Sequence, residues 1–265
     1  MHKQSQIIIT KILVALALLS YVSLNASDES TNSIKPLYSF MNTSVNYLDW
    51  DNSTENKTFH EDFSYLEVEG GAGWKWGEFY GFIDIENPTK SYNDKGPDNL
   101  RVAAKPILDI YLINGLALHI QDYYLTSENF YVNDIFTGLS YKYNSDFGLW
   151  IKLFIDTHYQ NSTYYDGFNG YMAGWVFNYD FVLFKQKFSI LQWHEIEFNR
   201  DKKYYQLDDG STVGDGKSYG TNGALSAWWH INEKFTTGVQ YRYADSKLGF
   251  NVYQSAIIYS LKYYF

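Results

Sequence analysis

Hydrophobic and polar positions alternate along the last residues of the chain, from Tyr253 to Phe265. One face is largely apolar and aromatic and ends in Phe265, whereas the other carries Gln254, Ser260 and Lys262. Because a β-strand sends successive side chains to opposite faces, this pattern predicts a strand. An open strand edge invites aggregation, and in lipid only a closed barrel pairs all the backbone groups of a sheet. We therefore expect a transmembrane β-barrel with Phe265 facing lipid.

Similar segments of about ten residues, each with partial alternation, recur along the chain between turn-rich stretches. We place strands at 37–48, 63–75, 78–87, 100–111, 116–126, 134–143, 148–160, 170–181, 187–199, 219–231, 234–245 and 252–265. This gives about twelve antiparallel strands, an even number as in single-chain bacterial barrels. The predicted fold class is therefore all-β, as one transmembrane antiparallel barrel in a single domain.

The predicted connections alternate between long and short. Those at 51–61, 87–99, 161–169 and 200–218 are long and rich in Asn, Asp, Ser and Gly, and those at 126–133 and 245–251 are of middling length. The connections near 77, 115, 145–147, 181–187 and 232 are short. Because outer-membrane barrels have long extracellular loops and short periplasmic turns, we expect all six longer connections on the extracellular side.

The N-terminal residues have the pattern of a secretory signal. Lys3 precedes an apolar run from Ile7 to Leu24, and Ala26 offers a small residue for cleavage. The alternative is a membrane-spanning helix, but the uninterrupted apolar stretch after Lys11 is shorter than the roughly 20 residues needed. We expect a signal peptide at 1–26, an N-terminal segment at 27–36 and the barrel at 37–265.

Composition fits an exported barrel in the outer membrane of a Gram-negative bacterium. Aromatic residues make up 20% of the chain, which suits the aromatic girdles of such barrels, and there is no cysteine for a disulfide or a thiol site. The formal charge of −9 becomes −11 without Lys3 and Lys11, which argues against nucleic-acid binding.

The face of each strand opposite its apolar side indicates what lines the lumen. In the cleaner strands this face combines aromatic rings with carboxylates, as in Trp150 and Asp156 or Phe82 and Asp84. Rings stack on a base or a sugar with about 1–3 kcal/mol each, and carboxylates accept hydrogen bonds from hydroxyl groups. The pattern favours a channel for flat, uncharged solutes, although rings that only fill a narrow barrel give the same pattern.

Two stretches of one predicted hairpin resemble a known family. They are DFSYLEVE from Asp62 to Glu69 and WGEFYGFID from Trp76 to Asp84, and they are similar to the Tsx-like nucleoside-specific channel-forming outer-membrane proteins, also called OmpK/Tsx-like porins. The resemblance implies a narrow twelve-stranded monomeric barrel that passes nucleosides and often serves as a phage or colicin receptor. Other partners it implies are outer-membrane lipid and the barrel-assembly machinery.

The alternation of inward and outward positions along each strand (parity) and the family resemblance together give the candidate channel-lining residues. Those that match the family stretch are Tyr65, Glu67, Glu69, Tyr80 and Asp84, and parity adds Phe82, Glu86, Lys152, Asp156, Trp228 and Arg242. Asp122, in a looser family match, would need a β-bulge to face the lumen. We expect no cofactor, no metal site and no catalytic residue.

Three alternatives stay open. The chain could be a structural or adhesin barrel, or a general porin, since its loops could contact partners. An outer-membrane lipase-type enzyme would need a nucleophilic serine beside a histidine, for example Ser189 or Ser226 with His158, His194 or His230. No surrounding motif supports catalysis, and no two histidines share a face of one strand as metal ligands do.

Overall fold

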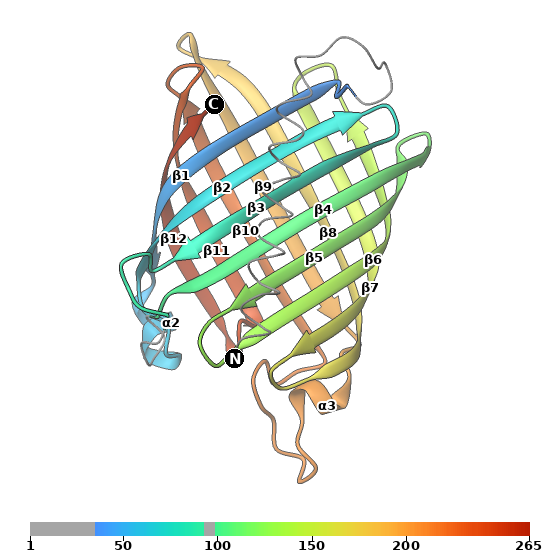
Figure 1. The fold of residues 1–265 in the computed structure, drawn as a ribbon, viewed down its shortest axis with the longest axis vertical. Coiled ribbons are helices and arrows are strands. Elements are labelled where there is room, and N and C mark those ends of the chain that lie inside the picture. Colours follow the sequence, from blue (N-terminus) through green and yellow to red (C-terminus); the bar gives the residue numbers. More distant parts are fainter. Residues whose placement is uncertain (1–34, 93–98) are drawn as a thin grey trace.

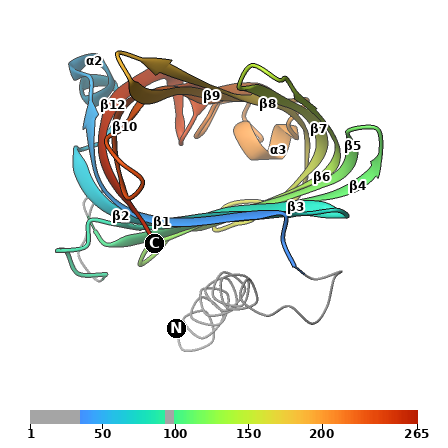
Figure 2. The ribbon, with the colours of Figure 1, turned by 90° about the horizontal axis from the view of Figure 1, so that it is seen from above.

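Twelve antiparallel strands close into one barrel in the computed structural model, which describes residues 35–92 and 99–265 (Figures 1 and 2). Neighbours in sequence pair with each other, and β1 pairs with β12. The strands are β1 (Tyr38–Trp50), β2 (Phe63–Trp74), β3 (Gly77–Glu86), β4 (Arg101–Ile113), β5 (Leu116–Thr126), β6 (Tyr131–Asn144), β7 (Leu149–Ser162), β8 (Asp166–Leu183), β9 (Gln186–Phe198), β10 (Tyr219–His230), β11 (Phe235–Lys247) and β12 (Phe250–Tyr264). The predicted fold class and strand number are confirmed. The predicted signal peptide at 1–26 lies outside the described residues.

The two ends of the barrel differ in their connections. One end has short turns, such as Asn114–Gly115, where both residues have the positive φ of a tight hairpin turn. The other end has the long connections, two of which contain short helices, α2 (Asn52–Lys57) and α3 (Lys202–Tyr205) (Figure 1). No helix in residues 35–92 and 99–265 is long and apolar enough to span a bilayer.

Two predicted loops are shorter than expected. The 161–169 loop is reduced to three residues, because β7 continues to Ser162 and β8 starts at Asp166. The 245–251 loop is a tight turn at Leu248–Gly249. In both places the strands extend with polar side chains, as at the pair Asn161–Asp166, and a polar strand end looks like a loop in sequence.

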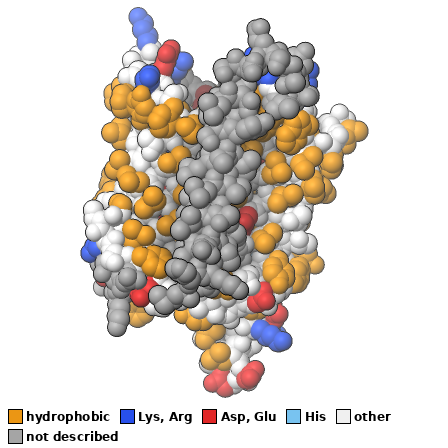
Figure 3. All heavy atoms as spheres, in the orientation of Figure 1, with side chains coloured by type: hydrophobic (Ala, Val, Ile, Leu, Met, Phe, Trp, Pro, Cys, Tyr) orange, Lys and Arg blue, Asp and Glu red, His pale blue; other side chains and the backbone are white. Residues whose placement is uncertain are grey.

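Burial is inverted relative to a soluble protein. On β7, Leu153 and Ile155 are about half exposed on the outside, whereas Asp156 and His158 on the inward face are 2% and 1% exposed. The outer surface shows hydrophobic side chains over its middle, with charged groups mainly toward the two ends (Figure 3). Exposed apolar side chains over buried polar ones are what a barrel in lipid requires.

The lumen is partly filled. Two apolar clusters pack inside it: one joins Leu48, Trp50, Phe63, Tyr65, Ala256 and Ile258 beside the contact of β1 with β12, and the other joins Phe136, Phe154 and Met172 on β6, β7 and β8. The cross-section is oval, with β9 on the wall opposite β1 and β3 (Figure 2). These clusters therefore take up part of the lumen.

Helix α2 fastens the first strand to the last at the long-loop end. The Asp51 carboxylate caps α2 by accepting hydrogen bonds from the backbone N–H groups of Ser53 and Thr54, at 2.8 and 3.0 Å. Its second oxygen accepts from the Ser255 hydroxyl of β12 at 2.5 Å. The Thr54 hydroxyl oxygen also accepts from the backbone N–H of Ser255. One carboxylate therefore holds both the helix and the barrel closure.

This contact predicts a pH-dependent stability at low pH. Burial acts to raise the pKa of Asp51, but the hydrogen bonds from Ser255 and Thr54 outweigh it and lower the pKa from 3.8 to about 2. A lowered folded pKa adds stability above pH 3.8 that is lost as the pH falls toward about 2. Urea unfolding in detergent should show this loss, and Asp51→Asn should abolish it.

The Asp51 variants separate charge from capping. Asn still caps a helix, whereas Asp51→Ala should cost about 1 kcal/mol at neutral pH. The same pH dependence between pH 4 and 2 in Asp51→Asn as in the wild type would contradict this role.

Candidate functional site

One group of lumen carboxylates lies on the β2–β3 hairpin. Glu69 is held by Lys262 of β12, whose Nζ lies 2.7 Å from Oε2, and it accepts a hydrogen bond from the Tyr80 hydroxyl at 2.8 Å. Glu67 lies 3.7 Å from the same ammonium. The Lys262 ammonium also lies over the Trp228 ring, 4.5 Å from its centroid. The structure thus brings together four predicted residues, Glu67, Glu69, Tyr80 and Trp228, around one lysine.

The neighbouring hairpin positions continue this acidic wall. Asp84 pairs with Glu67 in the register of β2 and β3, and Glu86 pairs with Tyr65. Arg101 of β4 forms an ion pair with Glu86 at 2.6 Å. Tyr65 itself is 9% exposed and belongs to the apolar cluster. Tyr65 therefore faces inward, as its parity indicates, but it packs against its neighbours.

An ion pair crosses the lumen. Lys105 of β4 binds Glu195 of β9 at 2.5 Å, and the Gln121 side chain donates a hydrogen bond to the same carboxylate at 3.1 Å. Four strands separate β4 from β9 on one side of the barrel and six on the other, so the pair joins nearly opposite walls. Phe82 is the β3 neighbour of Lys105 in register. This crossing pair divides the passage and marks a constriction.

Beside the crossing pair, an indole ring carries two cations. The Lys105 ammonium lies 5.4 Å and the Arg242 guanidinium 4.7 Å from the ring centroid of Trp193. Glu86, Glu195 and Tyr123 lie within electrostatic range of Arg242. Within the described chain, its guanidinium forms no hydrogen bond or ion pair. Arg242 thus presents N–H donors to the passage next to an aromatic face.

Two predicted residues lie in the wall rather than on the open passage. Lys152 is 7% exposed and binds Asp109 at 2.7 Å and Glu78 at 3.4 Å. Asp156 is 2% exposed, and its Oδ2 lies 3.9 Å from the His119 Nε2. Both side chains point inward, as the alternation along β7 predicts. A polar network formed by residues of β3, β4, β5 and β7 covers them, so they do not line the open passage.

Asp122 does not face the lumen. It pairs in register with Ile135, an exposed residue of the outer face, and the β5–β6 ladder is regular there. No bulge turns it inward. Its neighbour Tyr123 pairs with the buried Asp134 and takes the inward position instead.

Most residues at the constriction were missed in the sequence, namely Lys105, Gln121, Trp193 and Glu195. The two on β9 were missed because both faces of this strand mix polar and aromatic side chains, so neither face is clearly apolar. The polar residues of the outer face, Gln192 and His194, hydrogen-bond with the Tyr243 hydroxyl. One signal in the sequence does separate the two faces: Glu195 and Glu197 alternate with Ile196 and Phe198. This alternation places the two glutamates on the inward face of β9.

The structure brings together one of the serine–histidine pairs considered above. The Ser189 Oγ lies 2.8 Å from the His230 Nε2, and the His230 Nδ1 lies 2.9 Å from the Thr236 hydroxyl. A hydrolase triad places a carboxylate where Thr236 lies, because that charge stabilises the imidazolium that forms. Ser189 is also only 5% exposed. In the described residues, no three His, Cys, Asp or Glu side chains are placed to hold a metal ion.

Comparison with known proteins identifies the family. The model of the family described as "Nucleoside-specific channel-forming protein, Tsx" matches residues 45–265, which is most of the chain. The chain belongs to the Tsx channel family. Membership places this Tsx-family barrel in the outer membrane of a Gram-negative bacterium as a channel.

Several solved structures resemble this Tsx-family chain. A NanC porin is 13% identical with a TM-score of 0.49, and covers 83% of this chain and 98% of its own. A KdgM porin is 10% identical with a TM-score of 0.46, covering 84% and 99%. The outer-membrane phospholipase of Salmonella typhi is 11% identical with a TM-score of 0.41, covering 91% and 96%.

Proposed function

We propose that this channel passes nucleosides by facilitated diffusion, through weak binding at successive points along the lumen. The observation that carries the proposal is the Trp193 ring with the donors of Arg242 beside it, close to the acidic wall of β2 and β3. The family description supports the same solute class.

The chemistry of a nucleoside matches this arrangement part by part. The flat base stacks on the indole at about 1–3 kcal/mol, and its ring acceptors take hydrogen bonds from the Arg242 guanidinium. Carboxylates such as Glu67 and Glu69 accept hydrogen bonds from the ribose hydroxyls. Each contact is weak, so the solute can leave one site for the next, which a conducting channel requires.

Among the predicted lining residues we assign direct contact to those on the open passage, which are Glu67, Glu69, Tyr80, Phe82, Asp84, Glu86, Trp228 and Arg242. Tyr65, Lys152 and Asp156 are assigned a packing role instead, because they are each at most 9% exposed. The constriction residues Lys105, Trp193 and Glu195 join the contact set.

The alternatives account for less of the geometry. A general porin needs a wide aqueous lumen, whereas here an ion pair from Lys105 to Glu195 crosses it. A lipase-type enzyme needs an oriented and accessible nucleophile, which the Ser189–His230–Thr236 arrangement does not provide. The receptor role for phages or colicins, and the monomeric state, stay predictions.

Single-channel recording tests the function. The purified protein in a planar bilayer should give a low ion conductance that adenosine or thymidine reduces at micromolar to millimolar concentrations, because a bound nucleoside occupies the ion path. Ribose and sucrose at the same concentrations serve as controls that lack a flat base. An ionic current unaltered by every nucleoside would refute the proposal and favour a general porin or an adhesin.

A further inference from the structure

The loop between β9 and β10 places its helix α3 at the mouth of the barrel, at the end with the long connections. Its helix α3 lies at the long-loop end in Figure 1 and inside the outline of the barrel in Figure 2. Beyond α3, the rest of the segment projects away from this end of the barrel as a hairpin (Figure 1). Helix α3 at the base of the segment therefore lies across part of the opening.

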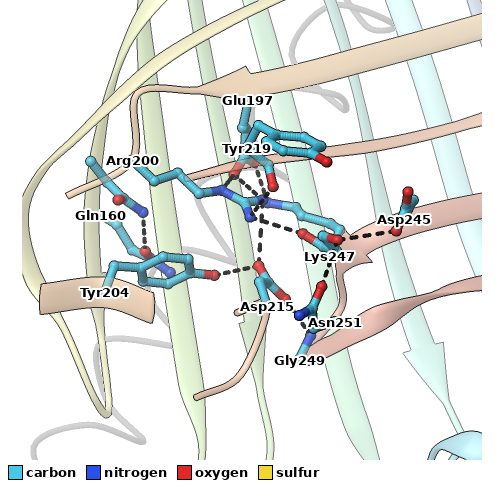
Figure 4. A network of polar contacts seen from close by, with 12 residues as sticks. Gln160, Glu197, Arg200, Tyr204, Asp215, Tyr219, Asp245, Lys247, Gly249 and Asn251 are labelled. Atoms are coloured by element: carbon cyan, nitrogen blue, oxygen red, sulfur yellow. Dashed lines mark hydrogen bonds and ion pairs between the residues drawn. The ribbon is translucent and has the colours of Figure 1, made fainter. Parts of the chain in front are cut away.

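A buried arginine holds the base of this segment. Arg200 is 3% exposed, and its Nε and Nη2 donate to one oxygen of Glu197 at 3.0 and 2.9 Å. Its Nη1 donates to the backbone carbonyls of Tyr219 and Ser246, at 3.1 and 2.8 Å (Figure 4). One guanidinium thus ties the loop to the ends of β9, β10 and β11.

The fit around this guanidinium is close. A Cβ atom on Gly220 would lie 2.3 Å from the Arg200 Nη2, so only glycine leaves room for the side chain. Burial acts to lower the pKa of Arg200, but the charges of Glu197 and Asp215 raise it above its usual value. The arginine is therefore charged whenever the protein is folded.

The returning half of the segment is held by Asp215, which is 2% exposed. Its carboxylate lies 3.4 Å from the Arg200 Nη2, accepts a hydrogen bond from the Tyr204 hydroxyl at 2.6 Å and accepts another from the backbone N–H of Gly249 at 2.8 Å (Figure 4). Asp215 therefore connects α3 to the turn between β11 and β12.

The opposite side of α3 is held by the β7–β8 connection and by the first residues of β8. The Tyr165 hydroxyl donates to Asp201 at 3.1 Å, and the Asn169 side chain accepts from the backbone N–H of Asp201 at 3.1 Å. The rings of Tyr165 and Tyr204 meet edge to face with centroids 5.6 Å apart. With contacts to β8 on one flank and to the β11–β12 turn on the other, the base of the segment is fixed to the barrel.

We infer that the segment 200–218 sets the upper size limit of solutes entering from outside, and that Arg200 is the residue that positions it. The inference concerns the size of the solute and not its chemistry, so it stands apart from the nucleoside proposal. It goes beyond the ion pair of Lys105 and Glu195, which narrows the lumen deeper inside.

Liposome swelling with sugars of increasing size tests this. The wild type should admit arabinose and exclude raffinose and stachyose. In a Lys105→Met background, which removes the deeper crossing pair, Arg200→Ala should leave arabinose entry unchanged and raise the swelling rate in raffinose by about threefold or more, because α3 no longer stays across the mouth. Lys217→Ala is the matched control, since this lysine of the same segment makes only peripheral contacts: an exposed ion pair with Asp245 at 3.9 Å and a contact with the Tyr219 ring, 5.4 Å from its centroid.

Limited trypsin cleavage reports independently whether the segment is released. Faster cleavage at Lys202 and Lys203 together with an unchanged size limit would overturn the inference. Where Arg200→Ala does not fold, residues 202–214 are replaced in the same background by a short Gly-Ser linker that retains Arg200 and Asp215. Raffinose entry through that variant supports the inference, and its continued exclusion overturns it. Arg200→Lys should give an intermediate size limit, because an ammonium cannot bridge the same strand ends.

Discussion

Trp193→Ala is expected to weaken nucleoside binding in the channel by about tenfold or more, measured as the concentration that halves the single-channel current. The ring supplies the stacking surface for the base, and stacking contributes about 1–3 kcal/mol per base. The substitution also removes the support of the Arg242 guanidinium, 4.7 Å from the ring centroid. Conductance without nucleoside should change less, because Lys105 and Glu195 still cross the lumen.

Trp229→Ala is the matched control for this change. Trp229 lies on the adjacent strand β10, but it is 41% exposed and faces outward. Trp193→Phe retains a ring and should retain much of the binding. Equal weakening by Trp193→Ala and Trp229→Ala would show that the effect comes from lost folding and would contradict the stacking role.

Lys105→Met is expected to raise the ion conductance of the channel about twofold or more and to shift it toward cations. The substitution removes the bridge between β4 and β9, and Glu195 is left with the Gln121 hydrogen bond. An uncompensated carboxylate in a narrow passage attracts cations, as acidic rings do in cation channels. Reversal potentials in a salt gradient measure the selectivity.

Lys262→Met removes the same charge from the lumen without opening it. Lys262 binds Glu69 along the wall, because β12 and β2 are separated only by β1. Both variants should therefore shift selectivity toward cations, but only Lys105→Met should raise conductance. A similar conductance gain in both would mean that lumen charge, and not the crossing pair, limits the ion flow.

The strands of the barrel were predictable where one face is clearly apolar. On β7, Leu153 and Ile155 indicate the lipid side, and the predicted inward positions of Lys152 and Asp156 agree with the structure. The acidic inner face of the β2–β3 hairpin was predictable in the same way, since Leu66 and Ile85 mark the outer face of this hairpin. Alternation alone carries this information, because a one-residue shift would reverse both faces.

The constriction could not be predicted in the same way. Lys105 and Glu195 are 90 residues apart, and their contact depends on the oval shape of the closed barrel. That shape is set by all twelve strands together. The position of α3 at the mouth could not be predicted either, because the Asp, Gly and Ser content of 200–218 resembles that of any exposed loop. Two of its charged residues, Arg200 and Asp215, are nevertheless buried.

The closure of β1 on β12 has a consequence for the order in which the chain folds. Every other strand pair joins neighbours in sequence, so each can form locally as a hairpin. The contacts of Asp51 and Thr54 with Ser255 span 204 and 201 residues. Bringing such distant points together costs about 5 kcal/mol of chain entropy when nothing has folded between them. Once the intervening hairpins are in place that entropy has already been lost. Closure is therefore the natural last step, and until then the edges of β1 and β12 need a partner strand to cover them.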